Sequence, residues 1–143
     1  MNDPALECAA HVMDTFSMVM RAIGTEMHRR GPSDLSVQQF RALMIVKHHE
    51  GASVSMVSHH LGSTISSTSK LVDGLVERHY LSREAAPDDR RQLILKLTES
   101  GADALEAVHR EKLSYLRDIL ATLSPGECAT VMLAMNLLRS ALT

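Results

Sequence analysis

Two clusters of polar side chains near the middle of the chain have the chemistry needed to bind phosphate groups and base edges. The first joins several hydroxyl groups to one ammonium group and comprises Thr64, Ser66, Ser67, Ser69 and Lys70. The second is a run of four charged residues, Asp88, Asp89, Arg90 and Arg91. Small hydroxyl groups let a helix enter the major groove, and guanidinium groups bind phosphates or a narrow minor groove. Both clusters therefore predict contact with double-stranded DNA.

Catalytic chemistry is not predicted. The sequence contains no Gly-rich phosphate-binding loop, no Ser nucleophile elbow and no metalloprotease motif. Its carboxylates are scattered over the outer faces of predicted helices, where solvation explains them. We expect the protein not to be an enzyme and to need no cofactor.

The hydroxyl cluster begins the second helix of a predicted helix-turn-helix. A short helix over residues 55–61 ends at Gly62, and a second helix covers about residues 64–78. The positions of the second helix that are expected to face inward are Ile65, Thr68, Leu71, Val72 and Leu75. Four consecutive Ser or Thr residues, 66–69, are poor helix formers for a face that only meets water. We interpret this helix as a recognition helix, with an ordinary solvated helix as the alternative.

The charged cluster lies at the turn of a predicted β-hairpin that covers residues 80–97. The second strand alternates, so that Leu93, Leu95 and Leu97 share one face and are expected to attach the hairpin to the domain. Thr98 then provides an N-cap for the next helix. The hairpin is the predicted wing of a winged helix-turn-helix.

The two carboxylates at the wing tip would repel DNA if they stood alone. We expect Asp88 and Asp89 to pair internally with an arginine, such as Arg83 or Arg91, and so keep the wing rigid. Arg90 and Arg91 are then the groups that reach DNA. A charged turn that serves only solubility is the alternative.

Long helices are predicted on both sides of this region. Residues 5–29 carry an apolar stripe at Leu6, Ala10, Met13, Phe16, Met20, Ile23 and Met27. A capping box at Ser36 and Gln39 predicts the start of the next helix, Thr98 begins a helix to about Thr122, and Ser124-Pro125 begins the last one. One short bundle cannot cover this much apolar surface, so we expect a homodimer that interleaves the first, fifth and sixth helices.

Composition and charge agree with a small helical protein. The 143 residues are 45% hydrophobic but only 3% aromatic, with no Trp, which suits helix packing. The net charge is −2, yet residues 29–96 hold 10 Lys or Arg against 7 Asp or Glu. With no apolar run near the roughly 18 residues of a membrane span and no secretory signal, we expect a cytoplasmic protein without membrane contact. Cys8 and Cys128 are too few and too far apart for a disulfide framework.

The helix-turn-helix, the wing and the motif D-x-R-x5-L-T together resemble the MarR family of transcription regulators. The motif consists of Asp89, Arg91, Leu97 and Thr98, and Gly101 and the segment 75–83 also match. The resemblance implies a mainly α fold with a small β-hairpin wing and flanking dimerisation helices, in a bacterium or archaeon. It implies a homodimer that binds a pseudo-palindromic operator, usually as a repressor. A small aromatic or other effector ligand, or an oxidant, often releases such regulators.

By this resemblance the chain is a single unit over residues 1–143. Its DNA-binding lobe covers about residues 36–98, and residues 1–30 and 99–143 form dimerisation helices. Helix 64–78 would enter the major groove and wing 80–97 the minor groove. Two positions depart from the family pattern. Gly74 lies where a basic residue often contacts the DNA backbone, and His79 lies where a glycine usually ends the recognition helix, so we expect strain there.

A sensing role for Cys8 or for any of the eight histidines is left open. Cys8 and His11 lie three residues apart, but a metal site needs three or four converging ligands, so no metal site is predicted. A redox- or metal-sensing regulator of the same fold is one alternative, and a winged-helix module that binds protein or RNA is another. Salt-dependent binding to duplex DNA separates such a module from a regulator.

Overall fold

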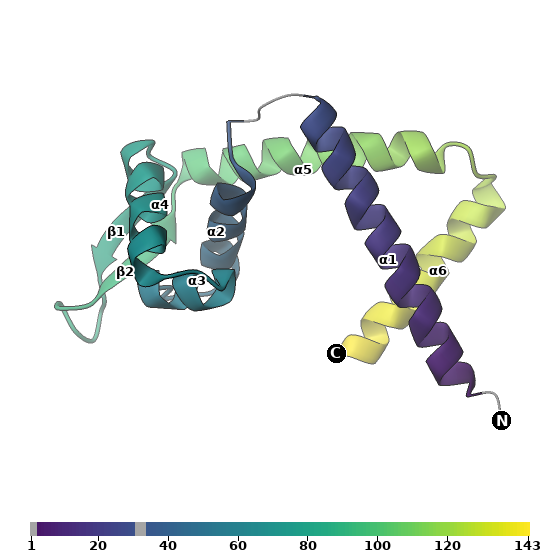
Figure 1. Cartoon of the computed structure of the whole chain (residues 1–143), viewed down its shortest axis with the longest axis horizontal. Coiled ribbons are helices and arrows are strands. Elements are labelled where there is room, and N and C mark those ends of the chain that lie inside the picture. The colour runs from purple at the N-terminus through teal and green to yellow at the C-terminus, as the bar shows by residue number, and fades with distance from the viewer. Residues whose placement is uncertain (1–2, 31–33) are drawn as a thin grey trace. The chain divides into compact units, whose positions relative to one another are not determined.

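The computed structural model describes residues 3–30 and 34–143, which form six helices and a two-stranded antiparallel hairpin (Figure 1). The chain divides into two compact units. Residues 34–109 contain the helix-turn-helix and the hairpin, and residues 3–30 and 110–143 contain the first and last helices. Helix α5 runs from one unit into the other. The mainly α fold with a small β-hairpin, predicted from the sequence, is confirmed.

Short-range capping interactions begin and end the helices of the first unit. Helix α2 (Val37–His48) starts at a full capping box, in which Ser36 Oγ accepts from the Gln39 N–H at 3.1 Å and Gln39 Oε1 accepts from the Ser36 N–H at 2.9 Å. Helix α3 (Val54–Leu61) ends at Gly62, whose φ of 64° requires the left-handed conformation that glycine adopts without strain. Helix α4 (Ile65–Glu77) starts at the N-cap Thr64. The predicted boundaries of these helices are confirmed to within one to three residues.

The hairpin consists of β1 (Leu81–Ala85) and β2 (Leu93–Leu97). Its register pairs Leu81 with Leu97 and Arg83 with Leu95. On its other edge, the Leu95 N–H donates to the carbonyl oxygen of Ala52 at 2.7 Å, which ties the hairpin to the segment between α2 and α3. The hairpin is therefore held to the helices by backbone as well as by side chains.

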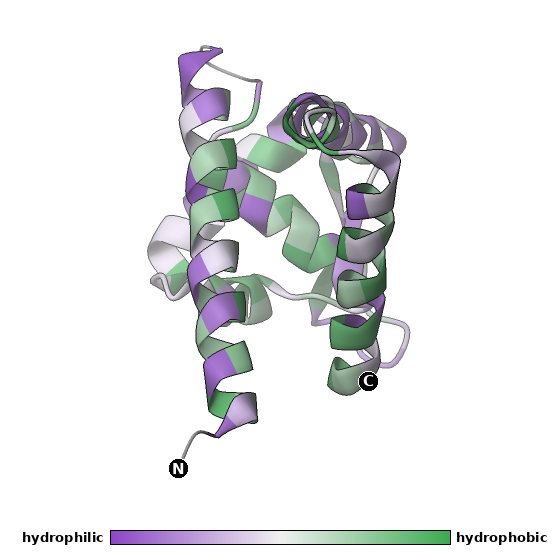
Figure 2. Ribbon diagram, turned by 90° about the vertical axis from the view of Figure 1, so that its right-hand side faces the viewer, coloured by the Kyte–Doolittle hydropathy of each residue, from purple (hydrophilic) through white to green (hydrophobic). Residues whose placement is uncertain are grey.

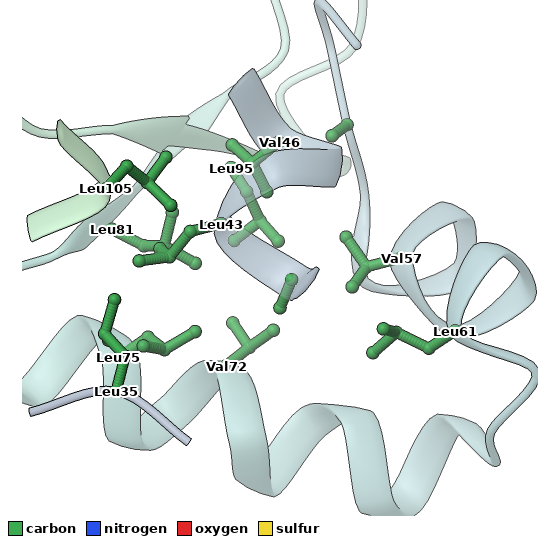
Figure 3. Packing of buried hydrophobic residues seen from close by; sticks show 12 residues of the cluster. Leu35, Leu43, Val46, Val57, Leu61, Val72, Leu75, Leu81, Leu95 and Leu105 are labelled. Carbon is green, nitrogen blue, oxygen red and sulfur yellow. The ribbon is translucent and has the colours of Figure 1, made fainter. Parts of the chain in front are cut away.

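The core of this unit lies where α2, α3, α4, the hairpin and the start of α5 meet (Figure 3). Its most completely buried large side chains include Leu43, Val57, Val72, Leu75 and Leu81. Two residues that we expected to face this core are exposed: Ile65 at the first position of α4 and Leu93 at the outer end of β2. Both lie at the ends of their elements and outside this buried cluster. The apolar pattern in the sequence therefore continues beyond the part of each element that packs against the core.

The start of α5 (Glu99–Leu120) is joined tightly to the end of α4. Thr98 Oγ1 accepts from the Gly101 N–H at 3.0 Å, as predicted for an N-cap, and donates to the carbonyl oxygen of His79. The Thr98 N–H donates to the Tyr80 carbonyl oxygen at 3.2 Å. A side chain on Gly101 would collide with that same carbonyl oxygen, so the close approach of the two segments requires glycine.

The second unit contains α1 (Pro4–Arg29), the remainder of α5 and α6 (Pro125–Leu142). Helix α1 starts at the N-cap Asp3, and α6 starts at the predicted Ser124 cap, which forms a capping box with Glu127. Of the predicted stripe on α1, Ile23 is buried, whereas large members such as Phe16 are exposed in the single chain. Apolar residues also dominate α6 (Figure 2). Within the described residues, no helix is long and apolar enough to span a bilayer.

Replacing Gly101 with alanine tests the junction between α4 and α5. We expect Gly101→Ala to lower the free energy of unfolding by about 1–3 kcal/mol, because the new methyl group overpacks against backbone that cannot rotate away. Urea denaturation followed by circular dichroism measures this change.

Gly74→Ala is the matched control for that substitution. Gly74 lies inside α4, and a side chain there meets no atom within 4 Å. The control should raise the free energy of unfolding by up to about 1 kcal/mol, since alanine favours helix more than glycine does. A Gly101→Ala protein as stable as the unsubstituted chain would contradict the close packing of this junction.

Candidate nucleic-acid interface

Hydrogen bonds from the turn between α3 and α4 back to the last residues of α3 fix the conformation of the turn. The Ser63 N–H donates to the Ser58 carbonyl oxygen at 3.1 Å, and the buried Ser58 hydroxyl donates to the Ser63 carbonyl oxygen at 2.6 Å. The Gly62 N–H donates to the His59 carbonyl oxygen at 3.1 Å. These contacts fix the angle at which α4 leaves α3, which is what a helix-turn-helix needs to present one helix to DNA.

The first two turns of α4 carry the predicted hydroxyl cluster. Ser66, Ser67 and Lys70 are exposed and Ser69 is half-buried. Thr64 is exposed too, but its hydroxyl oxygen accepts from the Ser67 N–H at 3.1 Å and therefore serves as the N-cap. The cluster is thus a rigid helical surface of small hydrogen-bonding groups with one positive charge.

A hollow of about 170 Å³ lies beside this surface. It is lined by Gln38, Leu61, Ser63, Ser67, Thr68 and Leu71. The hydroxyl oxygen of Thr68 is buried and has no hydrogen-bond partner within the described part of the chain. Such an unpaired group costs about 1–3 kcal/mol of stability. Gln38 lies at the start of α2, so no local sequence pattern indicates that it borders the α4 face.

The tip of the wing presents both of its arginines to solvent. Arg90 and Arg91 are exposed, as are Asp88 and Asp89. The Asp89 carboxylate accepts from the backbone N–H of Arg91 at 2.9 Å, and the Asp89 carbonyl oxygen accepts from the Gln92 N–H at 3.0 Å. Asp89 therefore orders the turn through backbone hydrogen bonds.

Arg83 pairs with Asp73 on α4 rather than with a carboxylate at the wing tip. Arg83 lies opposite Leu95 in the hairpin register, and paired residues share a face of the sheet. That face packs on α4, so the nearest carboxylate is on the helix. The pair joins α4 to the wing. No local sequence pattern indicates this ion pair, because Asp73 and Arg83 are ten residues apart and on different elements.

A second ion pair runs across the hairpin, where Lys96 Nζ lies 2.8 Å from Glu84 Oε2. This hydrogen bond and the charge of Glu84 raise the pKa of Lys96. The carboxylates of Asp73 and Glu84 thus neutralise two cations on the body of the wing. Lys70 on α4 and Arg90 and Arg91 at the wing tip keep their positive charges exposed to solvent.

The end of α4 has the strained geometry that the sequence predicted. His79 has a φ of 61°, the left-handed region that favours glycine, and it is the one non-glycine residue with positive φ in the described part of the chain. The Tyr80 N–H donates to Leu75 and the His79 N–H to Val76, which makes a Schellman motif. The His79 carbonyl oxygen also accepts from the Thr98 hydroxyl group. The hydrogen bond that attaches the end of the wing to α4 therefore also fixes the strained residue.

The sequence of this lobe matches a known family. A profile described as MarR family matches residues 33–92, which cover the helix-turn-helix and the first strand and turn of the wing. This lobe is similar to the MarR family. The chain therefore has the DNA-binding winged helix-turn-helix fold of a transcriptional regulator, as the sequence resemblance predicted.

Relatives of the chain extend the likeness beyond the lobe. An uncharacterized HTH-type transcriptional regulator of Mycobacterium bovis is 24% identical over 137 residues, which is 91% of this chain and 96% of the relative. A transcriptional regulator from Thermotoga maritima has the same fold, with a TM-score of 0.78, 20% identity and coverage of 96% of this chain and 94% of that structure.

A MepR variant from S. aureus bound to an oligodeoxyribonucleotide also shares the fold of this chain. Its TM-score is 0.64 at 17% identity, and the alignment covers 94% of this chain and 98% of that structure. MepR bound to ethidium bromide gives a TM-score of 0.64 at 19% identity, with 92% and 96% covered. At these identities the structures establish the fold.

Histidine and cysteine side chains do not form a metal centre in the described residues, where no three metal-ligating side chains gather. The structure does bring together histidines that are distant in sequence, since the rings of His49 and His60 lie 4.5 Å apart. Cys8 is exposed, and Cys128 is half-buried with its Sγ 3.6 Å from the Leu120 carbonyl oxygen. The sequence could not have shown the histidine pair, because it joins the end of α2 to α3.

A second hollow, of about 330 Å³, lies in the unit that contains α1 and α6. It is lined by Met18, Arg21, Ala22, Thr25, Glu26 and Tyr115. Hydrogen bonds from Arg29 and Arg30 lower the pKa of Glu26 to about 2, so Glu26 is ionised and engaged with those two arginines. Arg21 and Tyr115 add a positive charge and an aromatic ring to a lining that also contains the apolar Met18 and Ala22.

Proposed function

We propose that this MarR family regulator binds a pseudo-palindromic operator as a homodimeric repressor. In this proposal α4 lies in the major groove, with Ser66, Ser67, Ser69 and Lys70 toward DNA, and the wing arginines lie in the flanking minor groove. The observation that carries the proposal is that α4 and the wing belong to one lobe and are joined by the Asp73–Arg83 pair. Such a regulator would work in the cytoplasm of a bacterium or archaeon.

Charge and hydrogen bonding would have different roles in this complex. Lys70, Arg90 and Arg91 supply the electrostatic part of affinity, which depends on salt because bound phosphates release counterions. The uncharged hydroxyl groups of α4 supply hydrogen bonds whose value depends on the bases that they meet. Arg90 and Arg91 are at the end of a hairpin fixed by backbone contacts, so they reach DNA from a rigid support.

Removing the wing arginines tests the placement of the wing. The double substitution Arg90→Ala and Arg91→Ala should weaken binding to the duplex upstream of the gene. It should also reduce the slope of log K against log salt by about 1 for each phosphate group that the variant no longer binds. Fluorescence anisotropy at several salt concentrations measures both quantities.

The control for this experiment is Arg117→Ala, because Arg117 is an exposed arginine on α5 outside the lobe. It should leave the affinity and the salt slope unchanged. If the double wing variant also leaves both unchanged, the wing assignment is wrong. A flat salt response of the unsubstituted protein would instead contradict DNA binding and favour a protein-interaction module.

Exposed apolar side chains on α1, α5 and α6 support the homodimer. Examples are Phe16 on α1, Leu113 on α5 and Leu133 and Leu137 on α6. So many exposed large apolar side chains on three helices are unusual on a monomer and are typical of a subunit interface. A second copy of the chain would cover these side chains and place two recognition helices on one operator.

Charged substitutions on α6 test the dimer. Leu133 and Leu137 are 60% and 65% exposed and lie on one face of the helix, four residues apart. Leu133→Glu together with Leu137→Glu should convert a dimer to a monomer, because burying two carboxylates opposes association. Sedimentation equilibrium measures the mass, and Arg139→Glu, on the other side of the same helix, is the control. A dimer that survives the double substitution would rule out α6 as part of the interface.

Release by a small effector is the remaining part of the proposal. The hollow lined by Arg21 and Tyr115 is formed by residues of α1 and α5. Arg21, the Tyr115 ring and the apolar Met18 and Ala22 suit a small aromatic acid, because the Glu26 carboxylate in the same lining is paired with Arg29 and Arg30. Repeating the anisotropy assay with aromatic acids tests this part, with Arg21→Ala as the comparison. If a releasing ligand acts equally on both proteins, Arg21 is not part of its site.

A further inference from the structure

Ile65 is an exposed aliphatic side chain at the leading end of the recognition helix. Its side chain is 60% exposed, although the helical pattern predicted an inward position. Within residues 34–109 the exposed large apolar side chains are Val37, Ile65 and Leu93. Of these three, Ile65 is the one on α4. It therefore differs in chemistry from the hydroxyl groups that surround it.

The geometry of α4 explains why the lobe does not cover Ile65. The helix buries Thr68, Val72 and Leu75, and Ile65 is one turn before the first of them. Side chains on a helix tilt toward its N-terminus, so at the first position of α4 the side chain extends back past the first turn. Ile65 is not part of the core cluster.

The choice of isoleucine is not explained by helix stability. Isoleucine, a β-branched residue, is a weaker helix former than alanine, leucine, lysine or glutamate. Leaving this side chain exposed to water also gives up a burial free energy of the order of 1 kcal/mol or more. Thr64 already provides the cap that starts the helix, through its bond to the Ser67 N–H.

Duplex DNA offers a specific partner for an aliphatic group at this position. The N-terminal residues of a recognition helix contact base edges in the major groove. The C5-methyl group of thymine is the apolar group that the major groove displays, and neighbouring serines cannot match it with apolar surface. We propose that Ile65 packs against a thymine methyl group and is a specificity-determining residue for the operator. This inference rests on the proposed placement of α4 in the major groove.

The contact has a defined size. Burying one methyl group corresponds to a change in binding of about fourfold. It is uncharged, so it alters affinity without altering the salt slope, unlike a phosphate contact. It also depends on the base alone, because uracil differs from thymine in lacking this methyl group and pairs identically.

The test uses the full-length chain and a duplex that it selects from a random-sequence pool. Each thymine of the selected duplex is replaced in turn by uracil, and binding is measured by anisotropy. At one position in each half-site, uracil should weaken binding of the unsubstituted chain about fourfold. Ile65→Ala should bind the thymine and uracil duplexes equally. Urea denaturation should show unchanged stability, because Ile65 is outside the core.

Leu93→Ala is the matched control. Leu93 is 55% exposed on the wing of the same lobe, and the minor groove displays no thymine methyl group. This variant should retain the fourfold preference for thymine. Discrimination that survives in Ile65→Ala, or an unsubstituted chain that ignores uracil at every position, would overturn the inference while leaving DNA binding intact. A chain that selects no duplex at all would overturn the proposed function and the inference with it.

Discussion

The junction of α4, the wing and α5 is the contact on which the DNA-facing surface depends. The carbonyl groups of His79 and Tyr80 accept from Thr98, and Gly101 leaves room for the Tyr80 carbonyl group. The hairpin starts directly after Tyr80 and ends directly before Thr98, so both ends of the wing are fixed to the end of the recognition helix. Because α5 starts at the same place, a movement of its first turn would act directly on the wing.

The chemistry of the lobe is divided between neutral and charged contacts. Helix α4 presents hydroxyl groups, one aliphatic side chain and Lys70, whereas the wing tip presents two guanidinium groups beside two carboxylates. The Asp73–Arg83 and Glu84–Lys96 pairs neutralise the cations between them. These exposed pairs contribute little to stability, but they limit where phosphate is attracted. In the proposed complex the wing and Lys70 would supply affinity, and α4 would supply sequence preference.

The elements were predictable from sequence because their boundaries depend on interactions between near neighbours. The Ser36–Gln39 capping box, the Thr64 and Thr98 caps and the Gly62 turn each join residues a few positions apart. The exposure of Ile65 and Leu93 was not predictable. Periodicity shows which face of a helix or strand points inward, but it does not show how far along that face the neighbouring elements reach. The Asp73–Arg83 and His49–His60 contacts join separate elements, so no local pattern reports them.

Methylation protection with dimethyl sulfate tests the central claim most directly, because this reagent modifies guanine N7 in the major groove and adenine N3 in the minor groove. With α4 in the major groove and the wing beside it, a bound dimer should protect guanine N7 in two half-sites about 10 base pairs apart. It should also protect adenine N3 in the flanking minor grooves. Protection of guanine N7 without adenine N3 would contradict the wing placement, and protection of neither would contradict groove reading by this lobe.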